Sequence, residues 1–438
     1  WSVAPEVPEL PVGVMAPEAP CAAPCFSAAE RRMLQGTWPM ELLEDPARQP
    51  RLVRTAHEFL RELLIGNHLG EVLILPQGVD LLGLREQESL PDDLLQSLDG
   101  CKSVVEVLGK FRKNGSFLSR HKAGVEYVDD DGEQHGILPK ERRNLRARID
   151  EALALVAAGK VNPDLLYLAE LRLLEQREHP IGGDKVKTIC LRDVKDVIGP
   201  FATWTAYWDR HDEGVFLGGK WSGKGVHIDQ VLWSNVGKNW RGHKLLAAWP
   251  QGETSVQVAT DLEDHVFAPP LRQRHLDAMR RAAKIVLLRP GDVYLFSGGT
   301  AHTVLCVSDD VALGGYESIC TLHPAHVDLF LQTAGKGSSL WVDGTMPQDE
   351  FDEILEDVLE QLEGAAEQLR QDGGPGARVP PHTPECWRGL LDVLRADAEV
   401  QRELRAHFAS AVQACMERSA CMARGMSAPV VQAARELC

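Results

Sequence analysis

The segment LLRPGDVYLFSGGTAHTVLCV (residues 287–307) decides the fold class, because it sets short apolar runs between glycine-rich turns. Runs of four to eight apolar residues bounded by turn residues are typical of strands in a barrel or sandwich. The same texture continues outward over about residues 186–335, in the further runs TICL, GVFLGG, GVHIDQVLW, HKLLAAWP, TSVQVATDL and ALGGYESIC. One stretch, 269–284, instead predicts a helical insertion. We therefore expect a β-barrel domain over residues 186–335.

The flanking regions predict helices, so the expected fold class is α+β. Residues 1–27 are rich in proline and alanine, which predicts an extended or disordered lead-in. Residues 28–185 are expected to be mostly helical, beginning at a capping box of Ser27 and Glu30. Within them, 125–139 predicts a small hairpin that turns at Asp131-Gly132. Residues 346–438 are expected to be helical again.

Composition narrows the class of protein. The formal net charge of -17 disfavours direct binding to nucleic acid. Solubility is its simplest explanation, and a basic partner is the alternative. No apolar run is long enough for a membrane helix. The 10 cysteines are scattered and form no CxxC pairs, which favours a reduced, intracellular protein of the nucleus or cytoplasm. The chain starts at Trp1, so we interpret it as a fragment or processed product whose targeting stays open.

A metal site is predicted from three side chains. His227 and Asp229 are two residues apart in GVHIDQVLW, and strand alternation would put both on one face. Two histidines and one carboxylate leave positions of an octahedral metal open, which indicates non-heme iron(II). His302, at the start of HTVLCV, is the candidate third ligand. A core histidine at a strand start is the competing interpretation of His302.

Lys244 in RGHKLLAAWP predicts an anion site. It shares a strand face with Leu246 and Ala248, and a buried lysine is costly unless an anion pairs with it. The alternative is that Lys244 lies at the strand edge and reaches solvent.

Taken together, residues 214–250 and 288–305 resemble the JmjC family of the cupin superfamily, in its hydroxylase-like branch. That branch carries an HxD, a lysine before an apolar strand ending in proline, and a PGD turn before a distal histidine. All occur here in that order, over roughly residues 210–325. The resemblance implies a double-stranded β-helix (jelly roll) with His227, Asp229 and His302 binding Fe(II). It also implies that Lys244 binds the far carboxylate of 2-oxoglutarate.

The chain departs from the family pattern around the cosubstrate. Three residues before the first histidine, many relatives carry a threonine or serine, where this chain has Lys224. An asparagine often lies about ten residues after that histidine, where this chain has Gly237, with Asn235 and Asn239 nearby. Whether Lys224 or Lys244 anchors 2-oxoglutarate therefore stays open.

The expected function is that of an Fe(II)- and 2-oxoglutarate-dependent dioxygenase, which uses O2 to hydroxylate a protein side chain or to demethylate an N-methylated residue. The expected partner is a protein or basic peptide. One alternative is a non-enzymatic, metal-binding cupin scaffold, and another is a cupin isomerase with zinc or manganese. The acidic segment 348–371 predicts a packing helix, with a homodimer through the C-terminal helices as the alternative.

Overall fold

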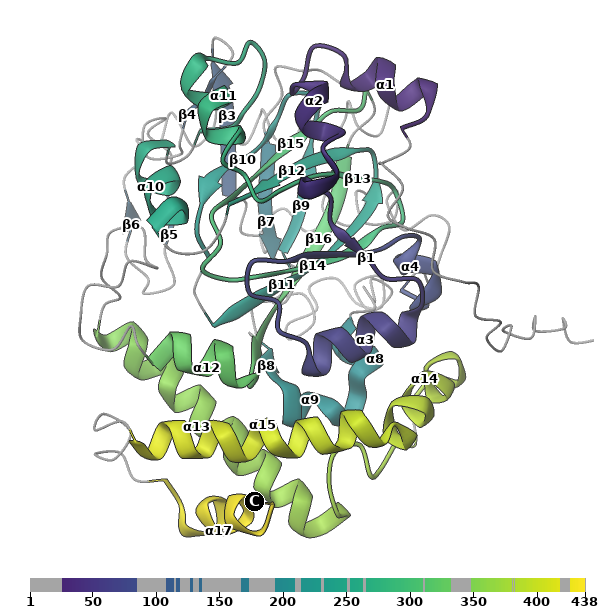
Figure 1. Ribbon diagram of the computed structural model, residues 1–438, viewed down its shortest axis with the longest axis vertical. Coiled ribbons are helices and arrows are strands. Elements are labelled where there is room, and N and C mark those ends of the chain that lie inside the picture. The colour runs from purple at the N-terminus through teal and green to yellow at the C-terminus, as the bar shows by residue number, and fades with distance from the viewer. Residues whose placement is uncertain are drawn as a thin grey trace, which may run out of the picture.

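The computed structural model describes residues 26–84 and most of 194–437, drawn as ribbons in Figure 1. Between 84 and 194 it describes only the backbones of five strands: β3 (Leu108–Lys113), β4 (Ser116–Leu118), β5 (Tyr127–Val128), β6 (Gln134–His135) and β7 (Tyr167–Arg172). Beyond 194 the gaps are 209–213, 230–231, 250–252, 263–264, 310–311, 332–347, 380, 382 and 418–425.

Eight consecutive strands are shared between two sheets. They are β9 (Gly214–Gly218), β10 (Gly223–His227), β11 (Trp233–Arg241), β12 (Lys244–Ala248), β13 (Lys284–Leu288), β14 (Val293–Ser297), β15 (His302–Cys306) and β16 (Ala312–Thr321). Strands β9, β16, β11 and β14 lie next to one another in the larger sheet. Strands β10, β15, β12 and β13 form the smaller sheet in that order. Chain neighbours therefore tend to lie in opposite sheets, so each sheet is built from residues far apart in the sequence.

The larger sheet extends beyond these strands. On one side β14 pairs with β2 (Val72–Leu75), which pairs with β1 (Arg51–Leu52). On the other side β9 continues to β7, β3 and β4, and β8 (Ala206–Trp208) pairs with the end of β16.

The two sheets enclose a small apolar core that identifies their interior faces. Leu246 and Ala248 of β12 pack in one cluster with Phe296 of β14. Cross-strand neighbours share a face of a sheet, so these contacts define which residues of every paired strand point inward. His302 pairs with Ala248, and Lys244 lies on the same face of β12 as Leu246. The side chains singled out by sequence therefore point into the space between the sheets.

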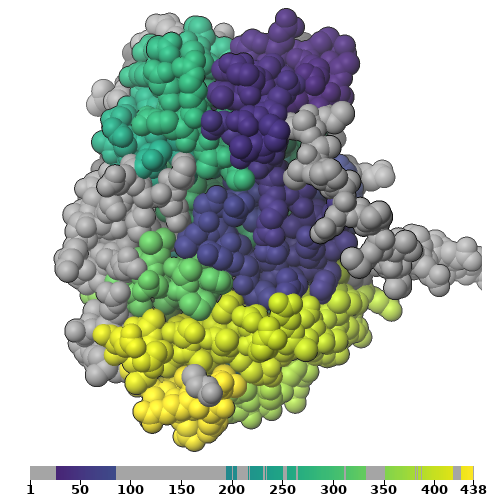
Figure 2. Space-filling view, viewed as in Figure 1, coloured from purple at the N-terminus to yellow at the C-terminus, as the bar shows by residue number. Residues whose placement is uncertain are grey.

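Helices cover both outer faces. The smaller sheet packs against α1 (Ala28–Leu34), α2 (Met40–Leu43), α10 (Glu253–Leu262) and α11 (Gln273–Met279). The larger sheet shares one apolar core with a layer of helices, in which α17 packs against α13 and α15. This layer consists of α3 (Ala56–Ile65), α8 (Val194–Ile198), α12 (Pro324–Leu331), α13 (Gln348–Asp372), α14 (Glu385–Ala396), α15 (Ala398–Glu417) and α17 (Ala428–Leu437). Short helices α4 (Gly78–Leu81) and α9 (Ala202–Thr205) and the turns η1 (Pro46–Arg48) and η3 (Gly199–Phe201) connect these elements. Figure 2 shows the C-terminal helices as a yellow layer at one end of the molecule. None of the described helices is long and apolar enough to cross a membrane.

Several local expectations are confirmed. Ser27 accepts a hydrogen bond from the Glu30 amide, and the Glu30 side chain accepts one from Ser27 in return. The insertion at 269–284 contains α11. Strands β5 and β6 pair as a hairpin, although its predicted turn at Asp131-Gly132 lies outside the described residues, as do the lead-in before residue 26 and the run TICL.

Two expectations are wrong. The run TSVQVATDL was expected to be a strand, as one of the short apolar runs between turns, but it forms α10. Its buried positions are Ser255, Val258, Ala259 and Leu262, which is helical spacing. Segments 108–113 and 167–172 were expected to be helical and are strands β3 and β7. β7 pairs with β9 at long range, so pairing with the sheet outweighs the local helix propensity of YLAELR.

Four histidines meet where the helical layer joins the larger sheet. His68 follows α3, His323 and His326 begin α12, and His407 lies in α15. Ring centroids are 5.6 Å apart for His68 and His326, 5.8 Å for His326 and His323, and 4.7 Å for His323 and His407. Neither ring nitrogen of the fully buried His326 has a hydrogen-bond partner.

These rings are held neutral. Burial lowers the pKa of His68 and of His407 to about 4, and lowers that of His326 well below its usual value, with repulsion between the rings adding to the effect. Glu62 and Glu403 act in the opposite direction on His68 and His407, but burial outweighs them. Arg51, which is paired with Glu62, adds to the lowering at His68.

The cluster predicts a loss of stability in mild acid. Because the folded-state pKa values lie below 6.5, the unfolded chain binds more protons between pH 6.5 and pH 4. The contribution of the neutral rings is complete above pH 6.5 and is lost as the pH falls toward 4. Replacing His407 with phenylalanine should make the loss of unfolding free energy between pH 7.5 and pH 5 smaller by roughly 2 kcal/mol. Urea unfolding of both proteins at the two pH values checks it, and parallel losses would contradict it.

Candidate metal centre

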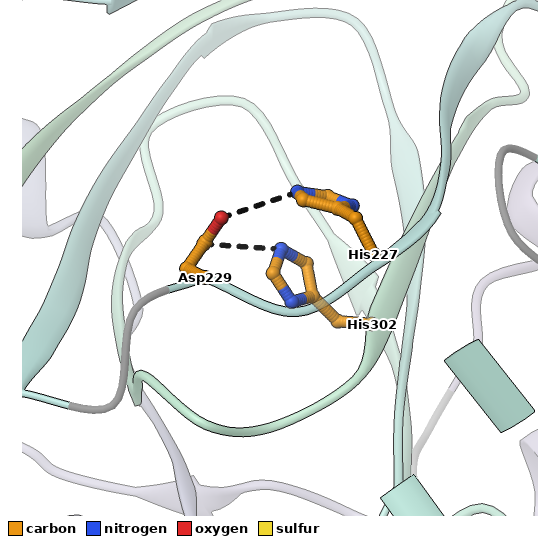
Figure 3. A group of neighbouring side chains, drawn as sticks. All are labelled: His227, Asp229 and His302. Atoms are coloured by element: carbon orange, nitrogen blue, oxygen red, sulfur yellow. Dashed lines mark ion pairs between the residues drawn. The ribbon is translucent and has the colours of Figure 1, made fainter. Parts of the chain in front are cut away.

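Three side chains converge on one point, as Figure 3 shows. Two of them come from the end of β10 and the loop after it, and the third comes from the start of β15. His227 ends β10 and His302 begins β15, and these residues are direct cross-strand partners. Asp229 lies just beyond the end of β10, where its backbone carbonyl accepts a hydrogen bond from the Gly299 amide at 3.0 Å. The prediction that these residues meet holds, but strand alternation is not the reason, because the strand ends at His227. The loop held by Gly299 brings Asp229 to the histidines.

The donor atoms are close enough to share one ion. Nε2 of His227 lies 3.4 Å from Oδ1 of Asp229, and Nε2 of His302 lies 3.5 Å from Oδ2. All three donor atoms lie within 4.8 Å of one another, and within the described parts of the chain no other group of histidine, cysteine or carboxylate side chains meets this condition.

Backbone carbonyls fix the orientation of both rings. Nδ1 of His227 lies 2.8 Å from the Gly225 carbonyl, and Nδ1 of His302 lies 3.0 Å from the Thr300 carbonyl. A carbonyl can only accept, so each Nδ1 donates a proton and each Nε2 keeps a lone pair. This is the arrangement that metal-binding histidines adopt.

Asn235 orients the carboxylate, and the sequence did not single it out for this role. Its Nδ2 donates to Oδ2 of Asp229 at 2.6 Å. Gly237, the position ten residues after His227 at which an asparagine is often found in the family, cannot carry a side chain. A Cβ there would lie 1.9 Å from the Tyr294 ring. Asn235 and Gly237 share the interior face of β11, so the parity of this strand was the available signal.

The ionisation states suit a cation. Burial lowers the pKa of His227 to about 3, and His302 adds to this by repulsion. Burial alone would raise the pKa of Asp229, but His227, His302, Lys224 and the Asn235 hydrogen bond together lower it. Neutral imidazoles and an ionised carboxylate are the states that bind metals. Two nitrogen donors and one oxygen donor with open positions fit iron(II).

Lys244 lies on the same interior face with no carboxylate beside it. Its side chain is 4% exposed, and burial lowers its pKa while the neighbouring Cys306 raises it. Its Nζ reaches across to the larger sheet, where a Cβ on Gly314 would lie 2.7 Å away. Oδ1 of Asn239 borders the same point, is buried and has no hydrogen-bond partner. Among the described residues no carboxylate pairs with Lys244, so an incoming anion would relieve the cost of burying its charge.

No protein-family model matches the chain, and no curated protein matches it. Solved structures of YcfD, a ribosomal oxygenase from Escherichia coli, are similar to it. The complex of YcfD with cobalt and 2-oxoglutarate is 11% identical, with 81% of this chain and 72% of that chain covered and a TM-score of 0.34. A further YcfD structure is 14% identical over 79% of this chain and 80% of that chain, with a TM-score of 0.33. At these TM-scores the metal centre rests on the geometry of its own side chains.

Removing Asn235 should weaken metal binding without removing a ligand. Asn235→Ala is expected to bind Co²⁺ roughly 10-fold more weakly, because the carboxylate loses its orienting hydrogen bond. His227→Ala and His302→Ala should abolish tight binding, whereas His243→Ala, outside the cluster, should bind as the wild type does. Calorimetric titration of the apoprotein with Co²⁺ measures this. Equal affinity of Asn235→Ala and the wild type would contradict the assigned role.

Proposed function

We propose that this chain is an Fe(II)- and 2-oxoglutarate-dependent dioxygenase. The observation that carries the proposal is a His227, Asp229 and His302 cluster on the same interior face as the buried Lys244 ammonium, which has no carboxylate partner among the described residues. A metal with open positions and a separate cation suit a ligand that chelates at one end and carries a carboxylate at the other.

The spacing along β15 supports this ligand. His302 begins the strand and Cys306 ends it, and Lys244 is the cross-strand partner of Cys306. Four residues of strand span roughly 13 Å, and both side chains reach into the gap from its ends. A short dicarboxylate can bridge the distance that remains between the metal centre and the Lys244 ammonium, whereas a monocarboxylate can interact with only one of them.

Each side chain has a defined task in this proposal. His227, Asp229 and His302 would hold the metal through two nitrogen donors and one oxygen donor. Iron(II), when bound there, would supply the activation of O2 that couples decarboxylation of 2-oxoglutarate to hydroxylation. Lys244 neutralises and positions the far carboxylate, and Asn235 keeps Asp229 turned to the metal. The apolar cluster of Leu246 and Phe296 forms one wall of the centre, where the Phe296 ring lies 4.6 Å from the His302 ring between centroids.

The strand order supports a double-stranded β-helix as the catalytic domain, over about residues 186–335. A mostly helical region at 28–185 and a helical region at 346–438 would flank it. The substrate we favour is a protein side chain, hydroxylated or demethylated at an N-methyl group. The net charge of -17 supports a basic peptide. Exposed Glu353, Glu356 and Glu360 on α13 offer a surface for such a partner or for a second copy of the chain.

A metal-binding scaffold without turnover is the second candidate. The observation that favours it is Lys224, which occupies the position before the metal ligands where a neutral hydroxyl residue is usual. Turnover of 2-oxoglutarate separates the two functions.

Succinate formation tests the proposal directly. Protein loaded anaerobically with iron(II) and then exposed to air should convert 2-oxoglutarate to succinate, and His227→Ala should not. Lys244→Met should raise KM for 2-oxoglutarate by about 10-fold or more with a smaller effect on kcat, because it removes a charged hydrogen-bond donor. Lys284→Met is the matched control, since Lys284 is two strands away from His302 and its ammonium donates to the Gln49 carbonyl.

Succinate formed equally by His227→Ala and by the wild type would contradict the assigned centre. No succinate from any form, with no binding of 2-oxoglutarate to the iron-loaded protein, would favour the scaffold.

A further inference from the structure

A bulge in β10 sets the direction of Lys224. Gly223 and Lys224 pair with Leu305 and Val304 of β15, but the next paired residues are His227 and His302. Two residues of β10, Gly225 and Val226, thus face the single residue Thr303 of β15. The Thr303 hydroxyl donates to the Lys224 carbonyl at 2.8 Å and secures the irregularity.

The bulge puts Lys224 and His227 on one face. In a regular strand, residues three apart point to opposite faces. Here Lys224 is the partner of Val304 and His227 is the partner of His302, both of which point to the interior. Bulges commonly redirect side chains next to active sites in this way.

The two lysines flank β15 from opposite sides. Lys224 comes from β10 beside Val304, and Lys244 comes from β12 beside Cys306. Val304 and Cys306 are alternate residues of β15 and share its interior face. Lys224 is the lysine nearer to the metal centre, because its partner Val304 is two residues from His302, whereas Cys306, the partner of Lys244, is four residues away. The buried carboxylate Glu317 lies on the other side of the larger sheet, on its outer face, where it pairs with Lys238.

We propose that Lys224 and Lys244 act together, each on one carboxylate of the dianionic cosubstrate. Lys224 attracts the carboxylate that lies at the metal, and Lys244 binds the far one. This inference rests on the proposed function. It answers the question of which lysine anchors 2-oxoglutarate by giving each lysine one of the two carboxylates. A cation beside the metal also has a cost, because it repels a divalent ion until the dianion arrives. The site is therefore built to favour metal and dianion together over metal alone.

The two effects of Lys224 have opposite signs, which gives a sharp test. Calorimetry would measure Co²⁺ binding to the apoprotein, and then binding of 2-oxoglutarate or of 2-oxobutyrate, which lacks the far carboxylate, to the Co²⁺ form. Lys224→Met should bind Co²⁺ about 3-fold more tightly and both oxo acids about 10-fold more weakly. Lys244→Met should weaken 2-oxoglutarate alone. Lys224→Arg, which keeps the charge, should stay within about 3-fold of the wild type throughout.

Lys220→Met is the control, since Lys220 pairs with Asp309. General loosening of the site would weaken every ligand together and would not tighten Co²⁺. Unchanged or uniformly weaker binding in Lys224→Met, with normal binding by the wild type, would overturn the role of Lys224 alone. If the wild-type Co²⁺ form binds no 2-oxoglutarate, the proposed function fails and this inference fails with it.

Discussion

The pairing of β10 with β15 is the interaction on which the metal centre depends. It makes His227 and His302 direct neighbours although they are far apart in sequence, and it leaves their rings 4.1 Å apart. The register is held by ladder hydrogen bonds and by the apolar residues that each strand buries. A slip of β10 by one residue would turn His227 to the outer face, away from His302, which β12 holds in place. The register thus sets the distance between the metal ligands before any metal is present.

The same strand pair explains how an apolar interior tolerates charge. The backbone carbonyls two residues before each histidine accept hydrogen bonds from Nδ1 of the two rings. The side chain of Asn235 donates a hydrogen bond to Asp229. Among the described residues of this interior, the metal-facing side of the triad, the Lys244 ammonium and Oδ1 of Asn239 stay unpaired. In a protein interior such groups cost stability unless a ligand completes them. We interpret the destabilising burial of the Lys244 ammonium as a sign of a binding site, because Gly314 on the facing strand leaves room for that ammonium.

Much of the site could be predicted because it depends on residue type and order. HxD, the lysine before LLAAWP and the histidine after the PGD turn identify the ligands and the anchor without knowledge of their contacts. The roles of Asn235 and Lys224 could not be predicted in the same way, because each depends on register. Gly237 is excluded only once the Tyr294 ring is known to cover it, and Lys224 turns inward only through the bulge. For the same reason β7 was mistaken for a helix, since its pairing with β9 is invisible to local propensity, while the capping box at Ser27 is local and was found.

The most direct measurement is the visible absorption spectrum of anaerobic iron(II) protein titrated with 2-oxoglutarate. Chelation of the metal by the 2-oxo acid at open positions should produce a new absorption band that saturates with one equivalent. The band should be missing in His302→Ala. A spectrum that stays unchanged in the wild type, at concentrations where iron binding is verified, would contradict the assignment of this centre as a cosubstrate-binding iron site.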